Sequence, residues 1–309
     1  MTRRAAAGLA RLLPLLLITA AAVIVLGAAL LAACGGSSGG SSPQPTATVT
    51  VTATPPETPA GSSSPSPSAS PTQTTVHLYF LRGEKLGVAE RRVKHTTMPA
   101  TASMKALLAG PTGAEQSAGL GTTIPAGTRL LGLTIDETTA RVDLSGEFAS
   151  GGGSLSMMAR IAQVVYTLTR FPTVRSVEFL LDGEPIEALG GEGIVLAGGQ
   201  RRADWREFEP PIFVESPGVG AVVASPFTLT GTASVFEGSF IARLVDSSGR
   251  RIVNTPVQAS RGAPGRGRFA QEIAYSTSAA RGTLIVYDQS MEDGSRQDEV
   301  RIPVTFAAD

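Results

Sequence analysis

Residues that usually supply chemistry are scarce in this 309-residue chain. It contains one cysteine and two histidines. A single cysteine excludes an intramolecular disulfide framework and a zinc site with several cysteines. The histidines, His77 and His95, leave little for histidine-based metal binding or acid–base catalysis. The formal net charge is zero, so no basic excess steers the chain onto nucleic acid.

Charge is also scarce at the N-terminus, which has the organisation of an export signal. Three arginines precede Leu12–Ala33, a run of 22 residues without a charge. The run ends in small residues, which are typical of a signal-peptide cleavage site. An uncleaved membrane-spanning helix is the alternative, because about 20 apolar residues cross a bilayer. Both interpretations keep the arginines in the cytoplasm and place everything after residue 34 outside it.

The sequence Leu31-Ala32-Ala33-Cys34 resembles the lipobox of bacterial lipoproteins. The resemblance implies cleavage between Ala33 and Cys34, a thioether-linked diacylglycerol on Cys34, and often a further acyl chain such as palmitate on the new N-terminus. Two or more acyl chains anchor a protein stably, whereas one chain binds marginally. We therefore expect the membrane as a partner through Cys34, with the protein on the extracytoplasmic face of the bacterial cell membrane.

Residues 34–75 predict a disordered tether. The stretch after Cys34 is rich in Gly, Ser, Thr, Pro and Ala and carries one charge, Glu57. It cannot bury enough apolar surface to offset the entropy lost on folding. Its expected role is to hold the folded part away from the membrane.

Residues 76–203 predict an α+β domain in which a mixed sheet carries two helices. Val76–Leu81 alternates and is rich in β-formers, which indicates a strand. The remaining expected elements are a strand at 88–94, a helix at 98–109, a hairpin at 127–136 and 139–144, a helix reaching 170, and a strand at 174–181. The resulting order is ββαββαββ, typical of helices layered on a sheet.

Periodicity also assigns faces within this domain. The longer helix is expected to start at a Ser154 or Ser156 cap. Its spacing places Leu155 in the core and Arg160 and Gln163 in water. In the hairpin, the alternation predicts one shared apolar face made by Leu131, Leu133, Ile135, Ala140, Val142 and Leu144.

Four motifs in this region resemble the GerMN domain, which is named from sporulation and spore-germination proteins. They are Ala106–Thr112, Gly119-Leu120, Ile124–Thr128 and Ala140–Ser145, in that order. The resemblance implies a fold like that of ring-building domains in envelope-spanning assemblies. It brings no established catalytic residue, and the family also occurs in lipoproteins of bacteria that do not sporulate.

Residues 204–309 predict an all-β immunoglobulin-like sandwich. Seven short β-rich runs follow one another, and Val300, Ile302, Val304 and Phe306 alternate in the last. Pro303 interrupts that run, which favours an edge strand or a bulge. Five segments resemble Gmad2, an immunoglobulin-like domain often found after GerMN: Ser216-Pro217, Ser225-Pro226, Thr230–Ala233, Val235–Gly238 and Asp288–Gly294.

Three candidate sites compete with simpler explanations. Asp288, Ser290, Glu292 and Glu299 have some of the spacing of a calcium loop, but glycine is absent at the required sixth position, so a polar hairpin turn is favoured. A serine hydrolase would need a Gly-x-Ser-x-Gly elbow between a strand and a helix, and the two predicted domains from residue 76 onward lack this pattern. Arg261, Arg266 and Arg268 form a small basic loop, for which a solvated turn is favoured over contact with anionic wall polymer or lipid.

These observations predict a non-catalytic, membrane-anchored envelope lipoprotein with a scaffold or adaptor role. Its expected partners are envelope proteins or further copies of itself, without nucleic acid, metal or cofactor. The assembly role rests on family resemblance. The alternative is a sensory lipoprotein that binds wall glycan or a small ligand, which requires a concave pocket with converging polar groups.

Overall fold

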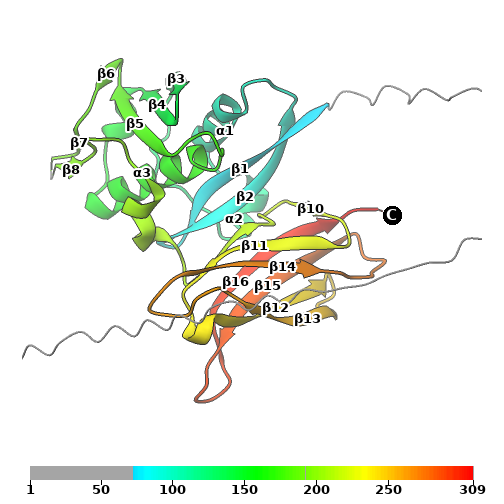
Figure 1. Ribbon diagram of the computed structural model, residues 1–309. Helices are drawn as coiled ribbons and strands as arrows, with labels where there is room; N and C mark the ends of the chain where they lie inside the picture. Colours follow the sequence, from blue (N-terminus) through cyan, green and yellow to red (C-terminus); the bar gives the residue numbers. More distant parts are fainter. Residues whose placement is uncertain (1–71, 192, 309) are drawn as a thin grey trace, which may run out of the picture. The chain divides into compact units, whose positions relative to one another are not determined.

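The computed structural model describes residues 72–191 and 193–308 (Figure 1). The predicted signal segment, the cleavage point at Ala33 and Cys34, and nearly all of the tether lie outside these residues. Within the described ranges, no helix is both long and apolar enough to cross a membrane.

The first half of the described chain is an α+β unit, as predicted. Its helices are α1 (Pro99–Leu108), α2 (Gly113–Ser117), the 3-10 turn η1 (Gly146–Ala149) and α3 (Ser154–Leu168). Its strands are β1 (Gln73–Arg82), β2 (Lys85–Lys94), β3 (Leu130–Asp136), β4 (Thr139–Leu144), β5 (Ser176–Leu181), β6 (Glu184–Pro185), β7 (Ala188–Leu189) and β8 (Ile194–Val195).

Strands β1 and β2 form a long antiparallel hairpin against which α1 and α3 pack (Figure 1). Strand β1 is buried on both faces: Leu78 and Phe80 point one way and Tyr79 the other, and all three are fully buried. The free edge of β1 is also satisfied, because the Tyr79 amide donates to Thr167 Oγ1 of α3 at 3.1 Å. This hairpin therefore forms the centre of the first half.

The second sheet of this half has the order β3-β4-β5-β6. Strands β4 and β5 are parallel, and α3 lies between them in the chain. Parallel neighbours need such a crossover, which a helix usually supplies. The amphipathic pattern of α3 thus places it between this sheet and β1.

The Leu-Ala-Gly-Pro-Thr motif fixes the link between α1 and α2. Thr112 caps α2, and the Glu115 carboxylate accepts a bond from the Thr112 amide at 2.7 Å, which completes a capping box. Arg91 of β2 donates to the carbonyls of Ala106 and Gly110 at 3.0 and 2.8 Å and forms an ion pair with Glu115. One arginine therefore joins both helices to the central hairpin.

The faces predicted for α3 are wrong at several positions. Arg160 and Gln163 were expected in water, but they are 2% and 0% exposed, while Leu155 is 51% exposed. No serine caps the helix; Gly153 occupies the N-cap position without a side-chain cap bond. Helical spacing identified an apolar stripe, but it could not show that both sides of the helix are covered.

Arg160 is buried because it binds the turn before its own helix. Its guanidinium donates to the carbonyls of Phe148, Ser150 and Gly151 at 2.6, 2.9 and 2.8 Å. Burial lowers its pKa. The arginine therefore satisfies backbone acceptors that no secondary structure would pair.

The shared apolar face predicted for strands β3 and β4 is likewise only partly observed. Ala140, Val142 and Leu144 of β4 are fully buried, but Leu131 and Ile135 are 49% and 42% exposed. Strand β3 lies at the edge of its sheet, and its pairing shifts between Leu130 and Gly132. The bulge moves Leu131 off the common face, because one extra residue reverses the alternation.

The second half is a β-sandwich, as predicted, preceded by the 3-10 segment η2 (Arg202–Phe208). One sheet has the order β14-β11-β9 and the other β10-β16-β15-β12-β13 (Figure 1). Their bounds are β9 (Ile212–Ser216), β10 (Val222–Val223), β11 (Phe227–Ala233), β12 (Ser239–Asp246), β13 (Arg251–Gln258), β14 (Gly267–Ile273), β15 (Arg281–Gln289) and β16 (Arg296–Phe306), with the 3-10 turn η3 (Phe236–Gly238) before β12.

The sandwich core comes from alternating residues of both sheets. Phe240 and Phe269, one from each sheet, meet edge to face with ring centres 4.9 Å apart. Ile302, Val304 and Phe306 of β16 are buried, as the alternation predicts. Pro303 is tolerated because β16 pairs fully with β15 and only over two residues with β10.

We predict that Arg160→Met lowers the free energy of unfolding by about 2 kcal/mol, because one buried and two partly buried carbonyls lose a charged donor. The matched control is Arg175→Met, an exposed position in the same half. Chemical denaturation of both variants measures the difference. Equal stability of the two variants would show that water replaces the guanidinium without cost.

Candidate functional site at the junction of the two halves

Backbone pairing joins the sandwich to the first half. The Val219 amide donates to the Val88 carbonyl, and the Glu90 amide donates to the Val219 carbonyl, both at 2.8 Å. Residue 219 thus extends the β1–β2 sheet along the free edge of β2. Gly220 makes this approach possible: its φ is +90°, and a Cβ there would lie 3.0 Å from the Glu90 carbonyl oxygen.

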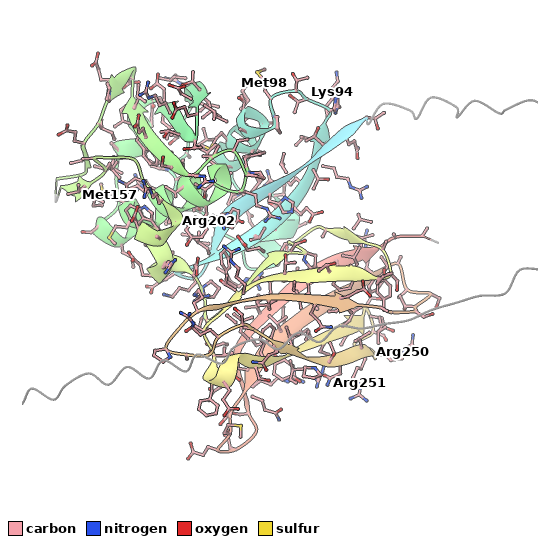
Figure 2. The ribbon with its side chains drawn as sticks, in the orientation of Figure 1. Lys94, Met98, Met157, Arg202, Arg250 and Arg251 are labelled. Atoms are coloured by element: carbon pink, nitrogen blue, oxygen red, sulfur yellow. The ribbon has the colours of Figure 1, made fainter. Side chains whose placement is uncertain are left out.

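Arg202 is the centre of a side-chain cluster at the same junction (Figure 2). Its guanidinium carbon lies 5.1 Å from the ring centre of Tyr79 and 4.7 Å from that of Tyr166. It forms an ion pair with Glu215 of β9 and donates to the Tyr79 hydroxyl at 3.0 Å. Phe213 completes the cluster, with its ring 6.0 Å from Tyr79.

Each hydroxyl and each carboxylate of the cluster has at least one polar partner. Tyr79 donates to Glu215 Oε1 at 2.7 Å, and Tyr166 donates to Glu209 Oε1 at the same distance. Glu209 in turn forms an ion pair with Arg266 at 2.9 Å. The side chains come from β1, α3, η2 and β9, so this network connects both halves of the described chain.

The electrostatics favour a charged Glu215 carboxylate and neutral phenols. Burial raises the pKa of Tyr79 and Tyr166 well above 10, and their neighbouring glutamates add to this shift. Burial also raises the pKa of Glu215, but the charge and hydrogen bonds of Arg202 outweigh burial and leave that pKa below its ordinary value. Both phenols therefore stay protonated near neutral pH.

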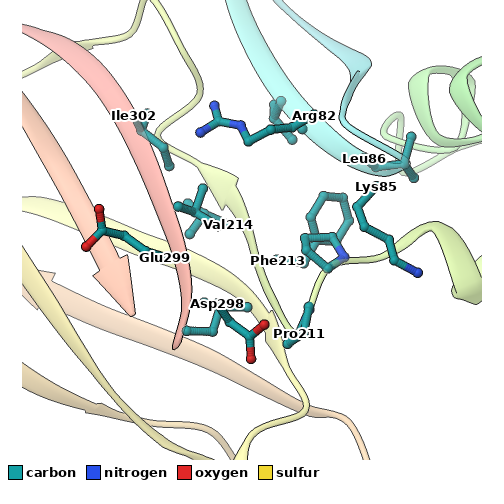
Figure 3. Close-up of a pocket in the computed structure, with 14 residues that line it drawn as sticks. Arg82, Lys85, Leu86, Pro211, Phe213, Val214, Asp298, Glu299 and Ile302 are labelled. Carbon is teal, nitrogen blue, oxygen red and sulfur yellow. The ribbon is translucent and has the colours of Figure 1, made fainter. Parts of the chain in front are cut away.

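A small apolar cavity lies beside this cluster, between β2, β9 and β16 (Figure 3). Its volume is about 260 Å³, and its walls include Leu86, Phe213, Val214 and Ile302. Arg82 and Lys85 also border it, on the opposite side from Asp298 and Glu299. Both cations already bind backbone: Arg82 donates to the Arg301 carbonyl at 2.7 Å and Lys85 to the Glu207 carbonyl at 2.5 Å.

The structure does not bring the sequence-predicted candidates together. Ala33 and Cys34 lie outside the described residues. His77, on β1 as expected, has Nε2 3.4 Å from a Glu90 carboxylate oxygen. His95 follows β2 in an exposed position, with Nδ1 3.4 Å from Thr74 Oγ1.

The calcium-loop residues form a hairpin turn, the favoured interpretation. Residues 290–295 connect β15 to β16, and the turn closes through a 2.9 Å bond from the Ser290 amide to the Ser295 carbonyl. Glu299, the expected last ligand, instead binds Arg296 and Arg301 at 3.0 and 2.7 Å. Among the described residues, no group of three or more metal-ligating side chains is placed to hold an ion.

The basic loop is not a simple solvated turn. Arg266 is half-buried in its ion pair with Glu209, and it also donates to the Pro210 carbonyl at 2.9 Å. Arg261 and Arg268 are exposed. The loop therefore attaches to the junction, a role that its sequence alone did not indicate.

Sequence reasoning missed the Arg202 cluster entirely. Arg202 and its partner Tyr79 are 123 residues apart. The available signals were a tyrosine within an otherwise apolar strand and an arginine pair between the two predicted domains. Neither signal identifies a partner, because pairing over such a separation depends on the tertiary fold.

Two family models match this chain. Residues 77–187 match a model described as sporulation and spore germination, of the GerMN type. Residues 211–295 match Gmad2, described as an immunoglobulin-like domain of bacterial spore germination. A search of curated proteins found no match.

Several solved structures show similarity at low identity. A candidate lipoprotein from Clostridium perfringens is 22% identical, with a TM-score of 0.33 over 44% of this chain and 93% of that one. The first GerMN domain of the Bacillus subtilis sporulation protein GerM is 20% identical, with a TM-score of 0.38 over 42% and 99%. The tandem GerMN domains of GerM are 16% identical, with a TM-score of 0.37 over 67% and 63%.

We predict that Arg202→Met lowers the free energy of unfolding by about 2–3 kcal/mol, because Glu215 is left charged and without its cation. Arg206→Met is the matched control, since it is exposed on the same short segment. Adding Glu215→Gln to Arg202→Met should recover part of the loss in a denaturation experiment. Equal stability of the two single variants would contradict a central role for Arg202.

The lowered pKa of Glu215 predicts a dependence of stability on acid. The carboxylate contributes stability above its ordinary pKa of 4.5, and this contribution disappears as the pH falls through its lower folded value. The stability difference between the wild type and Glu215→Gln should therefore shrink on acidification from about pH 6 to about pH 3. Thermal unfolding across this range measures it, and a constant difference would contradict the assignment.

Proposed function

Because the chain carries a GerMN domain at 77–187 followed by a Gmad2 domain at 211–295, we propose that it is a non-catalytic, membrane-anchored envelope lipoprotein with a scaffold or adaptor role. The relation to sporulation and germination proteins is the finding behind this proposal. Neither family description names a catalytic activity. The lipobox-like Leu-Ala-Ala-Cys sequence supports the anchor and the extracytoplasmic location.

The observation that carries the scaffold role is the joined interface between the two domains. Backbone pairing at Val219 and the buried network around Arg202 both cross it. Domains connected by a flexible linker alone would move independently. A fixed pair presents one continuous surface with a constant geometry, which is what an assembly platform requires.

A lipid on Cys34 would give this platform a defined place. We propose that the Gly/Ser/Thr/Pro-rich stretch between Cys34 and β1, which its composition predicts to be a tether, supplies the reach from the membrane. The exposed edge strand β3, with Leu131 and Ile135, offers one surface for a neighbouring protein.

The alternative, a ligand-binding sensory lipoprotein, is favoured by one observation. The cavity of about 260 Å³ between β2, β9 and β16 has apolar walls and charged residues at its border. Small-molecule sites commonly combine these features. A single ligand bound there with one-to-one stoichiometry would replace the scaffold proposal.

The test is crosslinking of the full-length protein in native membranes, with Cys34→Ala in parallel. The wild type should sediment with membranes, label with a lipid precursor, and crosslink to a discrete envelope protein or to itself. Cys34→Ala should lose the lipid label and keep its uncleaved signal segment, because the thiol is the acceptor. A labelled Cys34→Ala variant would contradict the anchor.

The scaffold role is tested separately by a Leu131→Lys/Ile135→Lys variant. Both side chains are exposed, so the fold should persist. The edge strand becomes charged, so the crosslinked product should be lost. Thr134→Lys, on the same strand and also exposed, is the control. A wild type that forms no crosslinked product in its native membrane would overturn the role.

A further inference from the structure

A second, larger cavity lies at the junction and is dominated by arginine. Its volume is about 990 Å³. The outer faces of β11 and β14 contribute Thr230, Thr232 and Ala270, and other parts of the lining come from the end of α3, from η2 and from the loop before β14. We call it the arginine groove after its six cations: Arg170, Arg202, Arg206, Arg261, Arg266 and Arg268.

Two of the six arginines are neutralised within the fold. Glu209 and Glu215 are the only acidic residues in the lining, and they pair with Arg266 and Arg202. The other four have no carboxylate within 4.0 Å in the part of the chain that the structure describes. The groove therefore carries four positive charges in excess.

This excess is costly for the protein alone. Like charges that face one cavity repel each other, and the repulsion destabilises the compact state unless counterions offset it. The chain as a whole has a net charge of zero, so the excess is local to this groove. A bound anion would offset the repulsion.

The residue types indicate which anion. The lining contains no lysine, and arginine presents a planar fork that matches the two oxygens of a phosphate. Thr230 and Ser234 add hydroxyl groups that can donate to further oxygens. The groove is also much larger than a single phosphate group, so several groups can bind at once.

We propose that the arginine groove binds a phosphodiester chain, with Arg170, Arg206, Arg261 and Arg268 contacting successive phosphates. This inference goes beyond the scaffold role and does not depend on it. Both domains supply the arginines, so the groove exists only because the junction is fixed. Arg202 and Arg266 position the walls and need not contact the ligand.

The groove fits a folded protein or a nucleic acid less well than it fits a phosphodiester chain. A protein partner needs apolar anchors, yet the only aromatic in the lining, Phe269, is 4% exposed. Single-stranded nucleic acids bind through bases stacked on exposed aromatic rings, which this lining lacks.

The test measures binding of fluorescent poly(glycerol phosphate) to the full-length protein in nanodiscs of neutral lipid. The wild type should bind, and its affinity should fall with salt. Arg206→Gln/Arg261→Gln/Arg268→Gln should weaken binding about tenfold or more, because three charge-assisted contacts are lost. None of the three has an ion pair in the fold, so stability should change little.

The matched control is Arg129→Gln/Arg175→Gln/Arg251→Gln, which removes the same charge from exposed positions outside the groove. The control should bind like the wild type. An equal loss in both triple variants would overturn the proposal, because it would show attraction to overall charge. Absence of binding by the wild type would overturn it as well.

Three further probes identify the source of the phosphate. Inorganic polyphosphate and vesicles containing phosphatidylglycerol both present phosphate groups. Binding of either probe that requires the groove arginines supports the proposal. Comparison of the two distinguishes a polymer from a lipid headgroup. Poly-glutamate carries carboxylates instead. Tighter, groove-dependent binding of poly-glutamate would overturn the assignment to phosphate.

Discussion

The described structure depends on one half-buried cation. Arg202 lies over the rings of Tyr79 and Tyr166 and forms an ion pair with Glu215, so it contacts the central hairpin, the long helix and the first strand of the sandwich. A partly buried charge is tolerated where its donors are satisfied, and here they are bound by a carboxylate, two hydroxyls and a backbone carbonyl. The network makes the orientation of the two domains specific.

Backbone pairing adds to this specificity. Residue 219 occupies the edge of β2, which would otherwise expose unpaired amides and carbonyls in the GerMN domain. The Gmad2 domain thus protects an edge that its neighbour leaves open. This complementarity gives a physical reason for the two domains to occur in one chain, in this order.

The junction between the two domains also determines where the two cavities lie. Both cavities that adjoin the junction draw their lining from two domains. The arginine groove in particular combines the basic loop of the sandwich with cations from η2 and from the segment after α3. The surface therefore becomes strongly positive where the two domains meet.

Local sequence features determined the elements of this protein. Alternation in Val76–Leu81 and in Val300–Phe306, and the glycine and proline after α1, predicted strands and a helix end that the structure contains. The lipobox-like Cys34 also comes from the sequence alone. Such features act between residues that are close in the chain, so composition and spacing reveal them.

Only the tertiary structure decided which polar residues are buried and which arginines meet. Arg160, Gln163 and Arg202 look like solvent-exposed residues in sequence, yet the fold buries the first two and half-buries the third. Arg160 binds the turn before its own helix, whereas distant segments supply the partners of Gln163 and Arg202. The apolar residues Leu131 and Leu155 are exposed for the converse reason: no segment covers them. Burial is a property of the whole packed chain, and a periodic pattern records only one face of one element.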